Sequence, residues 1–155
     1  PHIDRLLTLN DAVVLAFRRH SGSNTMTVIQ AAALYVGLNI LVLLVLALLV
    51  VRHRLSSAVA LGDGGVPHLT RAVRAHGNAT EYVPAALIGL VVLALLGVAP
   101  WIVHVGGVLL TAGRIAHGYG LSTNDGASPG RQIGTLASWV AFLWIGGASI
   151  VMAFL

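Results

Sequence analysis

The strongest constraint on the fold is a nearly continuous apolar segment at residues 28–51. Such a segment, roughly 24 residues long, can cross the ~30 Å hydrocarbon core of a bilayer as a tilted helix. Because the bilayer core offers no hydrogen-bonding partners, a spanning segment must satisfy its backbone groups internally, as an α-helix does. Further apolar segments follow at residues 78–99, 101–119 and 133–155. The sequence therefore predicts an all-α fold, an integral membrane four-helix bundle.

The composition indicates the same class of protein. Of the 155 residues, 57% are hydrophobic and 9% are charged, whereas soluble domains carry about a quarter charged residues. The chain has no cysteine, which excludes disulfides, thiolate-bound metals and a cysteine nucleophile. Any thiol chemistry must therefore use a thiol that a substrate brings. The net charge is +4, and in a membrane protein such an excess of basic residues usually marks the cytoplasmic loops. Nucleic-acid binding is not indicated, because the basic residues are not interleaved with aromatic residues on a soluble face.

Residues 1–25 follow a different pattern from the rest of the chain. Their apolar residues are spaced for an amphipathic helix, and a polar run from Ser21 to Thr25 precedes Met26. Two interpretations remain open. This leader is either non-native (a mis-set start, a fragment or an expression remnant) or a helix that lies on the membrane surface. We expect the four-span membrane domain to comprise residues 26–155.

The arginines predict the orientation in the membrane, because cytoplasmic loops carry an excess of Arg and Lys. Arg18 and Arg19 favour one orientation, but a larger group favours the other. The second loop has no charged residue. The helix ends that face the first and third loops carry six arginines: Arg52, Arg54, Arg71, Arg74, Arg114 and Arg131. We therefore expect loops 1 and 3 in the cytoplasm and both termini outside.

The polar residues at 71–84 predict a site inside the membrane. In a helix that starts near Pro67, the residues Arg71, Arg74, Asn78 and Glu81 fall within roughly 80° of one another. Glu81 is the only glutamate in the chain, and a lone carboxylate at membrane depth costs about 2.5–3.5 kcal/mol or more. It therefore needs a water-filled cavity or a cationic partner. The simpler alternative is a buried Arg74–Glu81 ion pair that fixes the helix register.

More cationic side chains are expected at the same end of the bundle. Arg114 and His117 share a face of the third span, and Arg131 precedes the fourth. Several arginines around one carboxylate leave surplus positive charge, which suits a ligand with carboxylates, while Glu81 suits an ammonium group. A small zwitterionic peptide with net negative charge meets these requirements.

Other polar residues have structural interpretations. We expect His104 to be a hydrogen-bonded core histidine, and Tyr35 and Asn39 to hold helices together. No metal is expected, because the histidines lack the helical His/Glu spacing of metal sites. Gly106, Gly107 and Gly113 allow close helix packing, and Arg52, Arg54 and Arg71 are interpreted as topology determinants.

Three motifs carry a resemblance to a known family: R-A-H-G-N-A-T-E-Y-V-P at residues 74–84, L-G-D-G-G at 61–65 and G-R-I-A-H-G-Y-G-L at 113–121. With them, residues 26–155 resemble the bacterial branch of the MAPEG family (membrane-associated proteins in eicosanoid and glutathione metabolism). The resemblance implies a homotrimer in a bacterial inner membrane, with glutathione bound between subunits near the cytoplasmic face. It implies Arg74, Asn78, Glu81, Tyr82 and His117 as glutathione-binding residues, with Arg131 facing the sulfur and Arg114 as the second candidate for that catalytic role.

Two departures from the family pattern concern the substrate. Members similar to prostaglandin E synthase have an arginine where this chain has Gly77, and a tyrosine where it has Leu121. Tyr119, the nearest tyrosine in this chain, lies on a different helix face from position 121. This chain therefore has fewer side chains to bind an anionic substrate group, and an eicosanoid substrate is disfavoured.

The resemblance implies a membrane-embedded glutathione-dependent transferase or peroxidase that acts on lipophilic electrophiles or lipid hydroperoxides. A thiol of pKa about 8.5 is only a few per cent ionised at neutral pH. Lowering this pKa by about two units requires roughly 2.7 kcal/mol of thiolate stabilisation, which one poorly solvated arginine can supply. The alternative is a non-catalytic lipid-binding or scaffold protein of the same fold. An ion pathway ranks last, because the outer half of the bundle offers little polar beyond His104.

Overall fold

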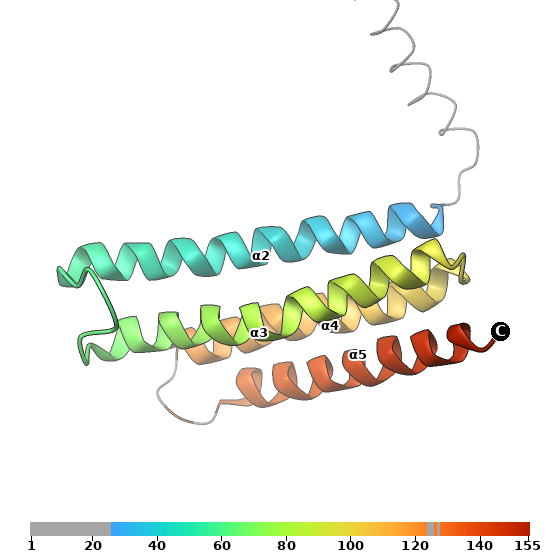
Figure 1. The fold of residues 1–155 in the computed structure, drawn as a ribbon. Coiled ribbons are helices and arrows are strands. Elements are labelled where there is room, and N and C mark those ends of the chain that lie inside the picture. Colours follow the sequence, from blue (N-terminus) through green and yellow to red (C-terminus); the bar gives the residue numbers. More distant parts are fainter. Residues whose placement is uncertain (1–25, 124–125, 127) are drawn as a thin grey trace, which may run out of the picture.

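A computed structural model describes residues 26–123, 126 and 128–155, and in this part the chain forms four helices and no strand. They run up and down in the order α2 (Val28–Ser57), α3 (Pro67–Leu95), α4 (Pro100–Thr123) and α5 (Pro129–Ala153) (Figure 1). The predicted all-α four-helix bundle is confirmed. The predictions for the leader, residues 1–25, lie outside the described residues.

Local sequence signals set the helix boundaries. The hydroxyl of Thr27 and the side chain of Gln30 form a capping box at the start of α2. Pro67 occupies the first turn of α3, as predicted. Gly97, at φ +71°, makes the tight turn between α3 and α4 in a backbone conformation that side chains with a Cβ rarely adopt. The Ser128 hydroxyl caps α5 by accepting from the Arg131 amide.

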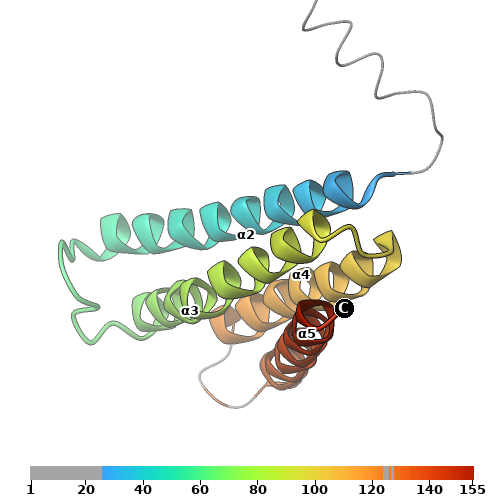
Figure 2. The same ribbon diagram turned by 45° about the vertical axis from the view of Figure 1, so that its right-hand side comes forward.

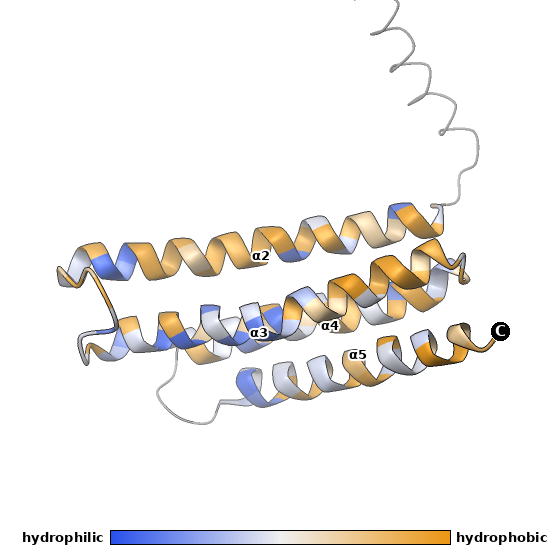
Figure 3. Cartoon of the chain, in the orientation of Figure 1, coloured by the Kyte–Doolittle hydropathy of each residue, from blue (hydrophilic) through white to orange (hydrophobic). Residues whose placement is uncertain are grey.

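Three of the helices, α2, α3 and α5, are long and apolar enough to cross a membrane on their own. The helix α4 is less apolar because it carries Thr111, Arg114 and His117, all of them buried. It also contacts each of the other three helices. The hydrophilic residues of α3 gather in its first half, towards the α2–α3 loop (Figure 3). The polar surface of the bundle therefore lies at one end.

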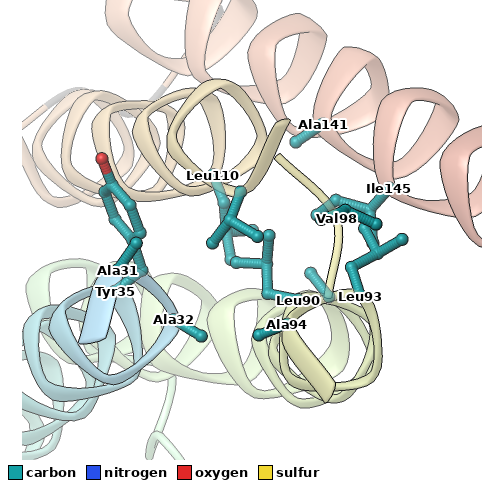
Figure 4. Close-up of a cluster of buried hydrophobic side chains, with 12 residues drawn as sticks. Ala31, Ala32, Tyr35, Leu90, Leu93, Ala94, Val98, Leu110, Ala141 and Ile145 are labelled. Atoms are coloured by element: carbon teal, nitrogen blue, oxygen red, sulfur yellow. The ribbon is translucent and has the colours of Figure 1, made fainter. Parts of the chain in front are cut away.

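The helices α3 and α4 form the centre of the bundle, with α2 on one side and α5 on the other. In the described part of the chain, α2 packs on α3 and α4 but does not contact α5, and the rotated view separates the two outer helices (Figure 2). Leu90, Leu110 and Ile145 meet in the apolar core near the α3–α4 turn (Figure 4). This larger apolar cluster thus lies at the end opposite the polar surface, and a smaller one, formed by Leu46, Ala75 and Ala79, lies between α2 and the first half of α3.

Glycines bring α4 close to its neighbours. A Cβ on Gly107 would overlap the ring of Tyr35, and a Cβ on Gly134 would lie 2.4 Å from the amide nitrogen of His117. The α4–α5 interface is therefore built on direct backbone contact. The predicted role of Gly106, Gly107 and Gly113 in close packing is confirmed.

Two polar contacts join α2 to α4 inside the apolar region. Asn39 Nδ2 donates to Thr111 Oγ1 at 2.8 Å, and a 2.9 Å hydrogen bond joins the Tyr35 hydroxyl to His104 Nδ1. These contacts confirm the structural interpretation of Tyr35, Asn39 and His104. They also fix the register of α2 against α4.

Candidate functional site

A cleft of about 990 Å³ lies between the first half of α3, the end of α4 and the start of α5. Five residues predicted as site residues from sequence line it, and they come from three different helices: Arg74, Asn78, Glu81, His117 and Arg131. Residues that are separated by more than fifty positions in the chain thus share one cavity. The structure therefore brings most of the predicted site together.

Arg74, Glu81 and Arg131 are exposed in the isolated chain. No hydrogen bond or ion pair links Glu81 to any residue that the structure describes. The alternative of a buried Arg74–Glu81 ion pair is therefore wrong for this chain. An unpaired carboxylate facing hydrocarbon is costly. The face that bears Glu81 needs water, a ligand or a second protein surface against it.

Arg114 lies behind the cleft and does not line it. Its side chain is 2% exposed, and Nη1 donates to Asn78 Oδ1 at 2.7 Å. The other terminal nitrogen, Nη2, donates to the carbonyl of Gly134 and to the hydroxyl of Ser138 on α5. Nε is buried without a partner among the described residues. Arg114 thus holds α3 and α5 to α4, and it orients the amide of Asn78 in the cleft wall.

Tyr82 also lies outside the cleft lining. Its ring makes a cation–π contact with the guanidinium of Arg114, whose carbon Cζ lies 5.0 Å from the ring centroid. Its hydroxyl accepts a 3.3 Å hydrogen bond from Trp139 Nε1. In the isolated chain, Tyr82 therefore contacts Arg114 and Trp139, and it lies outside the cleft.

His117 lines the cleft from α4 and is 4% exposed. Its backbone lies directly against Gly134 of α5. That contact fixes where the imidazole enters the cleft. Among the lining residues with ionisable side chains, His117 is the one that is buried.

Sequence reasoning missed part of the cleft wall. Thr70 and Leu121 line the cleft, as does Arg71, which the sequence placed on the face of the predicted site but which was interpreted only as a topology determinant. The signal for Arg71 was its position on the same helix face as Arg74 and Glu81. Thr70 follows the turn at residues 63–65, and this turn was its signal in the sequence. In the structure, Asp63 accepts hydrogen bonds from the Gly65 amide at 3.1 Å and from the Thr70 hydroxyl at 3.0 Å. These donors lower the pKa of the Asp63 carboxyl from its usual value.

The cleft has the chemistry of an anion site and not of a metal site. Three of its lining residues are arginines, Arg71, Arg74 and Arg131, and Glu81 is the one carboxylate among them. Over the described residues, no group of three or more His, Asp or Glu side chains is placed to hold a metal ion. The guanidinium groups favour carboxylates or another anion.

Comparison with known proteins places this geometry in a family. The model of the MAPEG family matches residues 32–151, a range that contains every predicted site residue. The chain belongs to the MAPEG family. It is 40% identical over 114 residues to the MAPEG-family inner membrane protein YecN of Escherichia coli strain K12, which covers 74% of this chain and 86% of YecN. YecN of Escherichia coli O6:H1 gives the same values.

Membrane localisation follows from this family membership together with the apolar helices. No solved structure matches the chain significantly. The predicted orientation of the loops and termini in the MAPEG chain stays a prediction.

Proposed function

We propose that this MAPEG protein is a glutathione-dependent transferase or peroxidase that acts on lipophilic electrophiles or lipid hydroperoxides. The observation that carries the proposal is the convergence of Arg71, Arg74 and Arg131 on the same cleft as Glu81. Glutathione has two carboxylates, one ammonium group and one thiol, so it needs two or more cations and one anion. The cleft supplies these groups in that proportion.

The residues would divide the work as follows. Arg71 and Arg74 bind the carboxylates of glutathione, and Glu81 accepts a hydrogen bond from its ammonium group. Arg114 orients the side-chain amide of Asn78 in the cleft wall. Arg131 lies at the start of α5, where the helix dipole adds to its own positive charge. No hydrogen bond or ion pair joins its guanidinium to the described residues. That charge is therefore available to stabilise a thiolate.

The chemistry needs only this stabilised thiolate. The thiol gives its proton to water, and the sulfur then forms a bond to the electrophilic carbon of a substrate dissolved in the bilayer as the bond to the leaving group breaks and that group departs as an anion. With a hydroperoxide, the thiolate sulfur attacks the terminal oxygen, a sulfur–oxygen bond forms as the O–O bond breaks, and the alkoxide takes up a proton from water to leave as the alcohol. A second glutathione then converts the resulting sulfenic acid to the disulfide and water.

We also propose that the working unit is a homotrimer with the cleft closed by a neighbouring subunit. The support is the exposure of Arg74, Glu81 and Arg131 in the isolated chain. At membrane depth these charges are expensive unless another surface covers them. A neighbouring subunit would exclude lipid from the cleft and complete the wall around glutathione.

Turnover tests the proposal. Purified protein in detergent is given glutathione with either a chlorodinitrobenzene or a lipid hydroperoxide, and conjugate, alcohol and glutathione disulfide are measured. We expect turnover of at least one of these substrates, and we expect it to be lost in Glu81→Gln with Arg74→Gln. Glutathione binding without turnover of either class would favour the non-catalytic alternative.

A further inference from the structure

A second cavity, of about 610 Å³, lies between α2 and α4, and no residue of α5 lines it. We call it the α2–α4 groove and define it by Leu38, Val45, Leu49, Ala72, Ile115 and Gly118. Its floor is narrow because a Cβ on Gly118 would lie 3.2 Å from Leu46 Cδ2. Val45 and Ile115, at 56% and 55% exposed, form its open edges. The groove therefore opens sideways towards lipid.

The apolar length of the groove matches one leaflet. From Leu38 to Leu49, α2 advances by about 17 Å at ~1.5 Å per residue. Half of the ~30 Å hydrocarbon core is about 15 Å. His53 follows one turn beyond Leu49 and also lines the groove. Apolar walls thus cover the depth of a single acyl chain, and polar groups begin where a headgroup would lie.

The polar end of the groove gathers donors and positive charge. The rings of His53 and His68 lie 4.9 Å apart between centroids, and His68 Nε2 is 3.0 Å from the Ser57 hydroxyl. Arg52 is adjacent to His53 on α2, and Arg71 follows His68 by three residues on α3. Ser122, a lining residue, buries its hydroxyl oxygen without a hydrogen-bond partner in the described part of the chain. A buried hydroxyl in the groove wall without a partner can donate to an acceptor that enters the groove.

We propose that the α2–α4 groove binds one anionic phospholipid, with an acyl chain along α2 and the phosphate at the His53–His68 end. A zwitterionic lipid would satisfy the apolar walls but has no net charge to match the guanidinium of Arg52. The site is separate from the glutathione cleft. Arg114 lines the groove on one side and bonds Asn78 of the cleft on the other. The proposal does not rest on enzymatic activity.

Native mass spectrometry of the detergent-purified oligomer tests this proposal, with phosphatidylglycerol and phosphatidylcholine of identical acyl chains as probes. We expect one phosphatidylglycerol per chain and a clear preference over phosphatidylcholine. A cation near an anionic headgroup contributes about fivefold in affinity. Arg52→Gln with His53→Gln should therefore reduce the preference by fivefold or more. The charge control is Arg54→Gln, whose guanidinium donates instead to the Ala60 carbonyl.

Val45→Trp, which fills the groove, should abolish the binding of both lipids. Its control is Leu143→Trp, which adds the same bulk at an exposed α5 position outside the groove. Equal binding of the two lipids would overturn the proposal, as would a preference that survives the loss of Arg52 and His53. A Val45→Trp variant of lower oligomeric mass would overturn it in favour of a second copy of the chain. Loss of glutathione turnover with lipid binding intact would bear only on the proposed function.

Discussion

Arg131 and Arg114 carry the same charge but lie in opposite settings. Arg131 is exposed at the cleft, whereas Arg114 is buried with both terminal nitrogens bonded to α3 and α5. A thiolate needs positive charge that is not already committed to other acceptors. At the residue scale, the geometry therefore favours Arg131 as the thiolate-stabilising group. Arg114 becomes a positioning residue.

Arg131→Leu is expected to leave glutathione affinity within a few fold and to remove the thiolate. A loss of about two pKa units corresponds to about 2.7 kcal/mol, so the thiolate content at neutral pH should fall up to a hundredfold. A pH titration of thiolate absorbance measures this directly. If turnover survives in Arg131→Leu and dies in a folded Arg114→Leu variant, the assignment of Arg131 is wrong.

Arg114→Gln is expected to lower stability more than it lowers intrinsic ligand affinity. The change removes the donor of Asn78 Oδ1, and an unsatisfied buried group costs about 1–3 kcal/mol. The Gly134 carbonyl loses one donor but keeps the Ser138 hydroxyl. Thermal unfolding in detergent measures the effect, with Arg52→Gln as the exposed control. Equal melting temperatures for the two variants would contradict a structural role for Arg114.

Glu81→Gln is expected to weaken glutathione binding while leaving the fold intact. The described residues offer Glu81 no partner, so its neutralisation breaks no internal contact. Calorimetric titration with glutathione and thermal unfolding separate the two effects. The double variant with Arg74→Gln is the check. Recovery of binding in that variant would indicate that the two residues merely balance each other's charge.

At the scale of elements, the sequence predicted the parts that local rules decide. The start of α3 follows from Pro67, and the turn before α4 follows from Gly97. The shared face of Arg74 and Glu81 follows from helical periodicity, and both line the cleft. The inward position of Arg114 did not follow, because it depends on which side of α4 meets α5. That choice is made by glycine contacts that periodicity does not encode.

Gly134→Ala tests the α4–α5 contact. The added Cβ would lie 2.4 Å from the His117 amide nitrogen and 2.5 Å from the Gly113 carbonyl oxygen, so the backbone must shift. Overpacking of this kind costs about 1–3 kcal/mol or more, and displacement of His117 should also lower glutathione affinity. Gly146→Ala on the same helix meets nothing within 4 Å and is the control. Unchanged melting temperature and affinity in Gly134→Ala would contradict the backbone contact.

At the scale of the whole molecule, a single chain leaves its charged face open. Arg74, Glu81 and Arg131 are exposed beside the apolar surfaces of α3 and α5. A neighbouring subunit would cover this face at lower cost than lipid would. The oligomer is thus expected to be part of the site. The resemblance seen in the sequence already implied a site between subunits, but the exposure of these three side chains in one chain depends on how α3, α4 and α5 pack.

Native mass measurement in detergent is expected to give a trimer. Glutathione should bind to this species, and dissociation of the subunits should abolish binding because it opens the cleft. Crosslinking in membranes provides an independent check on the subunit number. A stable monomer that still binds glutathione would contradict the proposal that the site lies between subunits.

Ultraviolet difference spectroscopy of the purified protein tests the central proposal most directly, because it reports the ionised thiol itself. The protein is titrated at neutral pH with glutathione and, as the control, with S-methylglutathione, which has no ionisable thiol. We predict a saturable thiolate band with glutathione and none with the control, and the band should be lost in Arg131→Leu. Saturable binding of glutathione without a thiolate band in the wild-type protein would contradict catalysis through a stabilised thiolate.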